Sequence, residues 1–446
     1  MNRFRSLVPC LLLFWACERA DEPQAQRDSA GRRGANPDVS APSTAGSSSG
    51  GSAGAGGTAG AAEGGTAGAA EGGAAGSGIG GAEYPEFEAV LPVLVRANAY
   101  FMSEWPDPGA MINFQQASNI WTRAVYYEGL LALYAIQPDS SYYTYAVNWG
   151  ESHAWGLNRG ATSVFADDQC AGQTYLDLFA IDPAPQRITD IRTSLDTMLE
   201  SNVVSNWFWI DAIQMSMPVF AKFGVLMNDS RYFEKMAALY EYTRNSAGDS
   251  SNAGGASGEG GPLYNTTDHL WWRDKTFDPP AASPNGKPVY WSRGNGWVFA
   301  GLARVLSVLP KTEPHRAGYV RDFQDMAEAI RAAQRSDGFW NVNLGDPADF
   351  PGPELSGTSL FTHGLAFGVR TGLLDEATFK PAIVKAWRAM ASAVHPDGFL
   401  GYVQRTGQQP SNGQPITFDS APDLDDFGLG CFLLGGSEVA RLSPRQ

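Results

Sequence analysis

The sequence predicts an all-α protein whose helices form an (α/α)6 toroid, a closed ring of six helical hairpins. The first observation is that apolar residues recur at helical spacing in about twelve segments between residues 84 and 446. The second is that strand-like alternation is confined to short runs such as 338–342 and 398–403. Both runs follow Asp-Gly and lie about sixty residues apart, which indicates a repeated helical hairpin and not a sheet.

The expected helices are separated by turn signals such as Gln137-Pro-Asp-Ser, Asp182-Pro and Pro310. In a toroid of hairpins, alternate helices line the centre and the others form the outside. Counting the expected helices along the chain, we expect the second, fourth and every further even-numbered helix to be an inner one. In that order, the twelve helices are expected to start near Glu86, Asn119, Ser140, Asp167, Pro185, Ile210, Ser230, Arg293, Arg316, Gly357, Glu376 and Asp425.

The even-numbered helices start with unusual polar or aromatic clusters. If these helices are parallel and inner, all of the clusters meet around one mouth of the ring. Helix capping accounts for Ser356, Asp423 and Asp425, but it does not explain Trp209 or Trp297 at the same ends. The clusters are Asn119–Arg123, Asp167–Gln169, Trp209–Asp211, Arg293–Asn295, Ser356–Ser359 and Asp423–Asp426.

The first sixteen residues carry Arg3 and Arg5 followed by an apolar stretch, which is typical of an export signal. The stretch is too short to span a membrane. Cys17 follows a small residue in a lipobox-like setting. We therefore expect a lipoprotein-type signal peptide over residues 1–16 and lipidation at Cys17, with cleavage near Ala20 or no processing as the alternatives.

Composition divides the rest of the chain into a linker and one domain. Residues 17–83 are expected to form a lipid-anchored flexible linker, because Gly, Ala and Ser dominate them and leave little apolar surface to bury. Residues 84–446 are dense in aromatics, so we expect one catalytic domain there. The protein is expected to be exported and anchored to a membrane by lipid alone, facing the periplasm or the cell surface.

Cysteine usage and charge limit the partners. Cys170 and Cys431 both lie in apolar helical patterns, so we expect buried thiols, with a disulfide as the alternative. The Cys and His residues have no zinc-site spacing, and neither a metal nor a cofactor is expected. The formal net charge of −15 argues against nucleic acid as a partner.

The segment from Tyr290 to Trp297 brings together an arginine, two tryptophans and two glycines where a helix is expected to begin. Arginine binds carboxylates in bidentate fashion, and an indole face packs against a sugar ring. This combination suits an anionic carbohydrate, with Arg293 and Trp297 as binding residues. The alternative is that Arg293 makes a buried ion pair with Asp268 or Asp274, instead of binding at the mouth with little packing.

A second segment, Trp207–Pro218, places Asp211 among aromatic and aliphatic residues. Burial raises the pKa of a carboxyl group because it disfavours the charged form. A carboxylic acid in such surroundings stays protonated near neutral pH and serves as a proton donor. An aspartate in the first turn of a helix is also a common helix cap, so Asp211 is a candidate catalytic residue with a structural alternative.

Four motifs, in this order, resemble glycoside hydrolase family 105, the unsaturated rhamnogalacturonyl hydrolases, and the related family 88. The resemblance spans residues 117–442. The motifs are Asp167–Gln173, the Trp-x-Asp-x-x-x-Met pattern of Trp209–Met215 with Pro218 after it, the Trp-x-Arg-x-x-Gly-Trp pattern of Trp291–Trp297, and Phe427–Glu438.

The resemblance implies hydration of a double bond in an unsaturated uronic acid. An acid delivers a proton to C4 of the C4=C5 enol ether, water adds at C5, and the resulting hemiketal opens with loss of the glycosidic bond. The resemblance assigns the acid and later base to Asp211. Asp167, or Asp168 as the close alternative, would orient the substrate and help to keep Asp211 protonated. Arg293 would hold a carboxylate or hydroxyl group, and Trp297 would stack.

Further substrate contacts are expected from Trp209, Arg273 and His363, although His363 is equally compatible with a core histidine. An anionic sugar needs local cations in this acidic protein, and Arg123 is a candidate beside Arg273 and Arg293. One departure from the family pattern is Asn265, which stands where the family has a histidine.

The sequence therefore predicts a glycosidase that removes unsaturated galacturonate from lyase-generated pectin or rhamnogalacturonan oligosaccharides. The alternatives are the same chemistry on unsaturated glucuronyl groups of ulvan or other glycans, and a lipoprotein that binds glycans without catalysis. A toroid with lyase or inverting glucanase activity is a third possibility, since Asp167 would then be the second carboxylate.

Overall fold

The computed structural model describes residues 83–112, 116–248, 261–420 and 426–445. The predicted signal peptide, Cys17 and almost all of the predicted linker lie outside these residues, as do Asp423 and Asp425. The domain boundaries, the lipidation site and the localisation therefore stay predictions.

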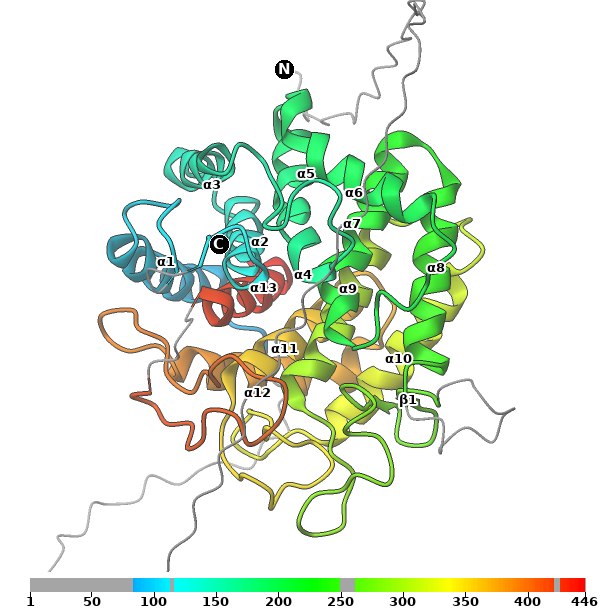
Figure 1. Ribbon diagram of the computed structural model, residues 1–446. Helices are drawn as coiled ribbons and strands as arrows, with labels where there is room; N and C mark the ends of the chain where they lie inside the picture. The colour runs from blue at the N-terminus through cyan, green and yellow to red at the C-terminus, as the bar shows by residue number, and fades with distance from the viewer. Residues whose placement is uncertain (1–82, 113–115, 249–260, 421–425, 446) are drawn as a thin grey trace, which may run out of the picture. The chain divides into compact units, whose positions relative to one another are not determined.

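The described residues form the predicted helical ring (Figure 1). Each inner helix packs against the next, and α13 closes the ring on α2. The inner helix of the second hairpin is interrupted at Cys170, so two short helices together take one inner position. The inner helices are α2 (Trp121–Tyr134), α4 (Ala166–Gln169) with α5 (Ala171–Ile181), α7 (Asp211–Met227), α9 (Ser292–Val308), α11 (Leu355–Arg370) and α13 (Asp426–Leu442).

The remaining helices lie outside this ring, and the only described strands form a small antiparallel pair. β1 (Tyr264–Asn265) and β2 (Leu270–Trp271) lie in the segment that leads into α9. The fold class, and the alternation of inner and outer helices, are confirmed. The outer helices are α1 (Phe87–Glu104), α3 (Ser140–Ser152), the 3-10 turn η1 (Pro185–Ile188) with α6 (Thr189–Leu199), α8 (Ser230–Asn245), α10 (Arg316–Ala332) and α12 (Glu376–Ser392).

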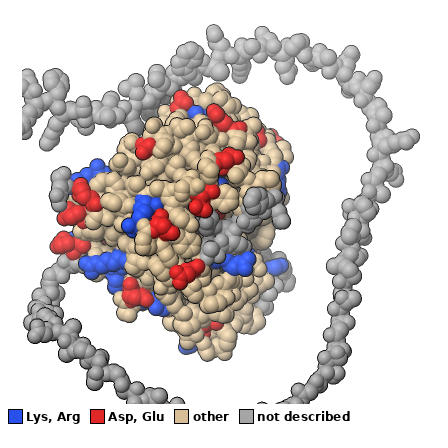
Figure 2. Space-filling model, turned by 90° about the vertical axis from the view of Figure 1, so that its left-hand side faces the viewer, with Lys and Arg blue, Asp and Glu red and all other residues tan. Residues whose placement is uncertain are grey.

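Burial follows the same division. Nearly every residue of α9, α11 and α13 is buried, whereas α10 and α12 bury one face. On the face shown in Figure 2, acidic and basic side chains are interspersed. Among the described residues, no helix is long and apolar enough to cross a membrane.

A layer of polar side chains crosses the inside of the ring. The Glu128 carboxylate accepts hydrogen bonds from Gln214 Nε2 at 2.8 Å and from the Cys170 thiol at 3.3 Å. Arg304 Nε lies 3.6 Å from Glu128 and donates to Gln173 Oε1 at 2.9 Å. These contacts join α2, α5, α7 and α9 across the inside of the ring.

Both cysteines of the predicted domain are buried and unpaired, which confirms that they are thiols. Cys170 belongs to the polar layer, and burial raises its thiol pKa well above the usual value. Cys431 lies in α13, and burial raises its pKa as well.

Glycines allow α2 and α13 to approach each other closely. Gly129 and Gly430 face each other there, and a Cβ atom at residue 430 would collide with the carbonyl oxygen of Val125. Because the obstacle is backbone and not a flexible side chain, the two helices would have to move apart.

We expect Gly430→Ala to destabilise the protein by about 1–3 kcal/mol or more, the usual cost of overpacking. Gly318→Ala is the matched control, because Gly318 lies in α10 with no atom near the position of a new Cβ. That change should stabilise by about 0.4–1 kcal/mol. Chemical denaturation measures both, and equal effects at the two sites would contradict the close-contact explanation.

Candidate active site

The N-terminal ends of the inner helices meet at one mouth of the ring. Arg123 at the start of α2 forms an ion pair with Asp426 at the start of α13, with Nε 3.0 Å from Oδ2. Trp121 lies edge-on to Trp297 of α9, with ring centroids 6.1 Å apart. The predicted convergence of the helix starts is therefore confirmed. Helix N-termini carry partial positive charge, so this mouth favours anions.

Asp211 is the first residue of α7 and is 8% exposed. Arg273, two residues after β2, donates from Nε to Asp211 Oδ2 at 3.0 Å and from Nη1 to Asp274 Oδ2 at 2.6 Å. Burial raises the pKa of Asp211, while the positive charges of Arg273 and Arg293 oppose the rise. The predicted Arg273 is thus in direct contact with the predicted acid.

Asp167 and Asp168 have different surroundings, although they are adjacent in the short helix α4. Asp167 is half-buried, and burial together with the nearby Asp211 raises its pKa to about 7. Asp168 is fully buried, accepts a hydrogen bond from Ser163 Oγ at 2.5 Å and lies 3.5 Å from Arg159 Nε. The charge of Asp211 therefore contributes to the pKa of Asp167, whereas the Asp168 carboxylate is bound by Ser163 and lies beside Arg159.

Burial raises the pKa of both carboxyl groups. The sequence suggested that Asp167 would help to keep Asp211 protonated. The pKa of Asp211 is raised, as expected, but the main cause is burial, which outweighs the opposing charges of Arg273 and Arg293. The charge of Asp211 in turn contributes to the raised pKa of Asp167, so the two groups titrate as a coupled pair.

Arg293 is completely buried at the start of α9. Its Nη1 donates to the carbonyl oxygen of Gln404 at 2.7 Å, and its Nη2 donates to that of Arg405 at 2.9 Å. The guanidinium also lies over the rings of Trp291 and Phe427, at 4.6 and 4.8 Å. The expectation that Arg293 contributes little packing was wrong, because it holds the loop around residue 404 against α9.

The alternative ion pair of Arg293 with Asp268 or Asp274 is not formed either. Asp274 accepts from Arg273, and Asp268 accepts hydrogen bonds from Tyr290 at 2.6 Å and Asn265 at 3.1 Å. The charge of Arg293 nevertheless acts on Asp211. Its contact with substrate stays a prediction.

The predicted stacking residues lie in the walls of the site. Trp297 is fully buried, and Trp209 is 3% exposed. Trp209 packs between Phe165 and Phe208, with ring centroids 5.1 and 4.5 Å away. Phe208 itself is 52% exposed, so it offers the open aromatic face in this group, which the sequence analysis missed.

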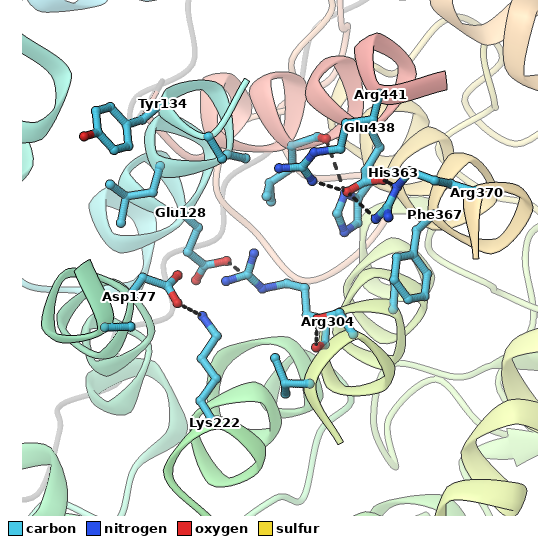
Figure 3. Close-up of a pocket in the computed structure, with 18 of the residues that line it drawn as sticks. Glu128, Tyr134, Asp177, Lys222, Arg304, His363, Phe367, Arg370, Glu438 and Arg441 are labelled. Carbon is cyan, nitrogen blue, oxygen red and sulfur yellow. Dashed lines mark hydrogen bonds and ion pairs between the residues drawn. The ribbon is translucent and has the colours of Figure 1, made fainter. Parts of the chain in front are cut away.

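His363 lies away from this mouth. It is eight residues into α11 and lines a cavity of about 450 Å³ formed by the C-terminal halves of the inner helices (Figure 3). Its Nδ1 is 3.3 Å from the carbonyl oxygen of Leu434, and burial lowers its pKa to about 4. The structure does not bring His363 together with Asp211, so its predicted contact with the substrate lacks support.

A second cavity, of about 500 Å³, adjoins the predicted site through Arg273, the one predicted site residue among those that line it. Arg273 and Asp274 line it together with Phe208 and Gln408. Gln408 Oε1 is 3.3 Å from Arg273 Nη1. Sequence reasoning missed Gln408 because it follows a Gly in a turn-rich loop with no local sign of chemistry.

Known proteins resemble this chain over most of its length. The family model described as Glycosyl Hydrolase Family 88 matches residues 93–443. An unsaturated 3S-rhamnoglycuronyl hydrolase of Formosa agariphila is 31% identical over 359 residues, which cover 76% of this chain and 88% of that protein. A protein of the same description from an Alteromonas species is 33% identical over 246 residues, covering 54% of this chain and 53% of that protein.

A solved structure, described as a glycosyl hydrolase family 88 protein from Bacteroides vulgatus, has the same fold. Its TM-score is 0.71 at 31% identity, and the match covers 80% of this chain and all of that one. The fold, the order of the motifs and the family match agree, and the chain belongs to glycoside hydrolase family 88.

Proposed function

We propose that this glycosidase removes an unsaturated uronic acid from the non-reducing end of oligosaccharides in which that acid is linked to rhamnose. The proposal rests above all on the coupled carboxyl pair of Asp167 and Asp211 at the positive mouth of the ring. An anionic sugar is attracted there, and one proton is available near neutral pH.

The linkage to rhamnose is common to both substrate classes that the sequence raised, pectic rhamnogalacturonan and ulvan-type glycans. The name of the Formosa agariphila relative specifies a 3S-rhamnoglycuronyl substrate. Glycuronyl is the general term for a uronic acid residue, so an unsaturated glucuronyl-rhamnose and an unsaturated galacturonyl-rhamnose disaccharide are the two candidate substrates.

In this mechanism Asp211 gives its proton to C4 of the C4=C5 double bond. Asp211, now a carboxylate, accepts a proton from the water molecule that adds to C5. The hemiketal at C5 then opens, the bond to the leaving sugar breaks, and that sugar departs with a free hydroxyl group. The charge of Asp211 contributes to the raised pKa of Asp167, so the two groups titrate as a coupled pair during the reaction.

A second candidate function has a specific observation in its favour. Two nearby carboxyl groups with different pKa values also suit ordinary glycoside hydrolysis, in which one acts as the acid and the other as base or nucleophile. The two chemistries differ in the need for a double bond in the substrate, so the saturated analogue separates them.

Purified protein should consume an unsaturated uronyl-rhamnose disaccharide with loss of the ultraviolet absorbance of the enol ether. The saturated analogue should remain intact, because it has no double bond to protonate. Product analysis by mass spectrometry checks both. Equal hydrolysis of the saturated disaccharide would contradict hydration and favour the second candidate.

Asp211→Asn should lower kcat by at least about 10²-fold, the lower range for general acid–base catalysis. Asp168→Asn is the matched comparison, since Asp168 faces Ser163 and Arg159; its loss should be far smaller. Steady-state kinetics on folded protein measure both. An Asp211→Asn variant that keeps more than about a tenth of the activity would transfer the acid role to Asp167.

Arg273→Met should move the basic limb of the kcat–pH profile to higher pH. Arg273 lowers the pKa of Asp211, so its removal raises that pKa, and the protonated acid persists to higher pH. Arg159→Met is the control, because Arg159 is 55% exposed and solvent screens its charge; its shift should be smaller. An unchanged or lowered basic limb in Arg273→Met would refute the assignment of Asp211 as the acid.

A further inference from the structure

Arg273 belongs to the candidate acid site and to the 500 Å³ cavity at the same time. Its Nε holds Asp211, and its Nη1 faces Asp274 and Gln408 in the wall of the cavity. A cavity of this volume is in the range of small-ligand pockets and accommodates a sugar residue. The guanidinium of Arg273 therefore lies between a sugar bound in this cavity and the candidate acid Asp211.

One wall of the cavity is an exposed aromatic ring. Phe208 is 52% exposed, although apolar rings in the rest of the described domain are mostly buried. Trp209 packs against it at 4.5 Å and holds it in place, and Tyr242 of α8 lines the same cavity. A phenyl face of this kind suits the apolar C–H face of a pyranose.

The charge in the cavity is favourable for an anion. The Asp274 carboxylate accepts hydrogen bonds from Arg273 Nη1 at 2.6 Å and from the backbone N–H of Thr276 at 2.9 Å. Lys275 also lines the cavity, is exposed, and makes no ion pair with another described residue. In a chain of net charge −15, an unengaged lysine beside an exposed phenyl ring is suited to a sugar that carries an oxyanion.

We propose that this cavity is the subsite for the sugar on the leaving side of the scissile bond, with Phe208 against its ring and Lys275 binding a sulfate ester on it. This inference rests on the proposed function, since it assigns the leaving side of the same substrate. A carboxylate offers related chemistry, and the experiment below separates the two anions.

Binding to the Asp211→Asn protein tests the subsite without requiring turnover. Calorimetry would compare three disaccharides with the same unsaturated uronic acid: one with rhamnose 3-sulfate, one with unmodified rhamnose and one with a second uronic acid. A hydrogen bond to a charged group is worth a factor of roughly 10–150 in affinity. The sulfated disaccharide should therefore bind at least about 10-fold more tightly than the unmodified one.

Adding Lys275→Met should remove most of this preference and leave the Kd of the unmodified disaccharide unchanged, whereas Lys275→Arg should retain the preference. Lys311→Met is the matched control, because Lys311 is an exposed lysine that does not line the cavity. Phe208→Ala should weaken all three disaccharides by a similar factor, and Phe208→Tyr should restore binding. Unchanged melting temperatures would show that the variants are folded.

Several outcomes would overturn the proposal. A preference that survives Lys275→Met, or equal binding of sulfated and unmodified disaccharides, would remove the sulfate role. Tighter binding of the uronic acid disaccharide would assign the cavity to a carboxylate instead. Unchanged binding in Phe208→Ala would remove the stacking role. Failure of the wild-type protein to hydrolyse any of the three would count against the proposed function alone, because the Kd values decide the subsite.

Discussion

The parallel direction of the inner helices is the constraint on which the rest of the site depends. It brings the starts of α4 and α7 to one mouth, and with them Asp167 and Asp211. Helix N-termini stabilise carboxylates, which is opposite to what a proton donor needs. Burial counteracts this effect and raises the pKa of both residues, and the charge of Asp211 raises that of Asp167 further. The same convergence gives an acidic protein a mouth that attracts anionic sugars.

The polar layer of Glu128, Gln214 and Arg304 crosses the inside of the ring and borders the cavity that contains His363. Its groups satisfy one another inside the ring, and removing one partner would leave a buried charge without compensation. The cavity behind the layer has its own paired charges, such as Lys222 with Asp177 at 2.6 Å (Figure 3).

Helical periodicity and turn residues were sufficient for the ring, because each hairpin is encoded locally. Asp211 and Asp167 could be found because they lie at helix starts, which the pattern locates. The partners of Arg293 could not, since Gln404 and Arg405 come from a loop more than a hundred residues away and depend on tertiary packing. The position of His363 could have been predicted from the sequence. It lies eight residues into a helix, about 12 Å from the helix start, which is too far for a residue of the mouth.

Arg273 connects the cavity beside Phe208 and Lys275 to the candidate acid. It divides its donors between Asp211 and Asp274, and it lines the cavity with the same guanidinium. Its charge opposes the rise that burial causes in the pKa of Asp211. Because one side chain serves both places, a change at Arg273 alters the acid and the wall of the cavity together, whereas a change at Lys275 alters the cavity without removing a partner of Asp211.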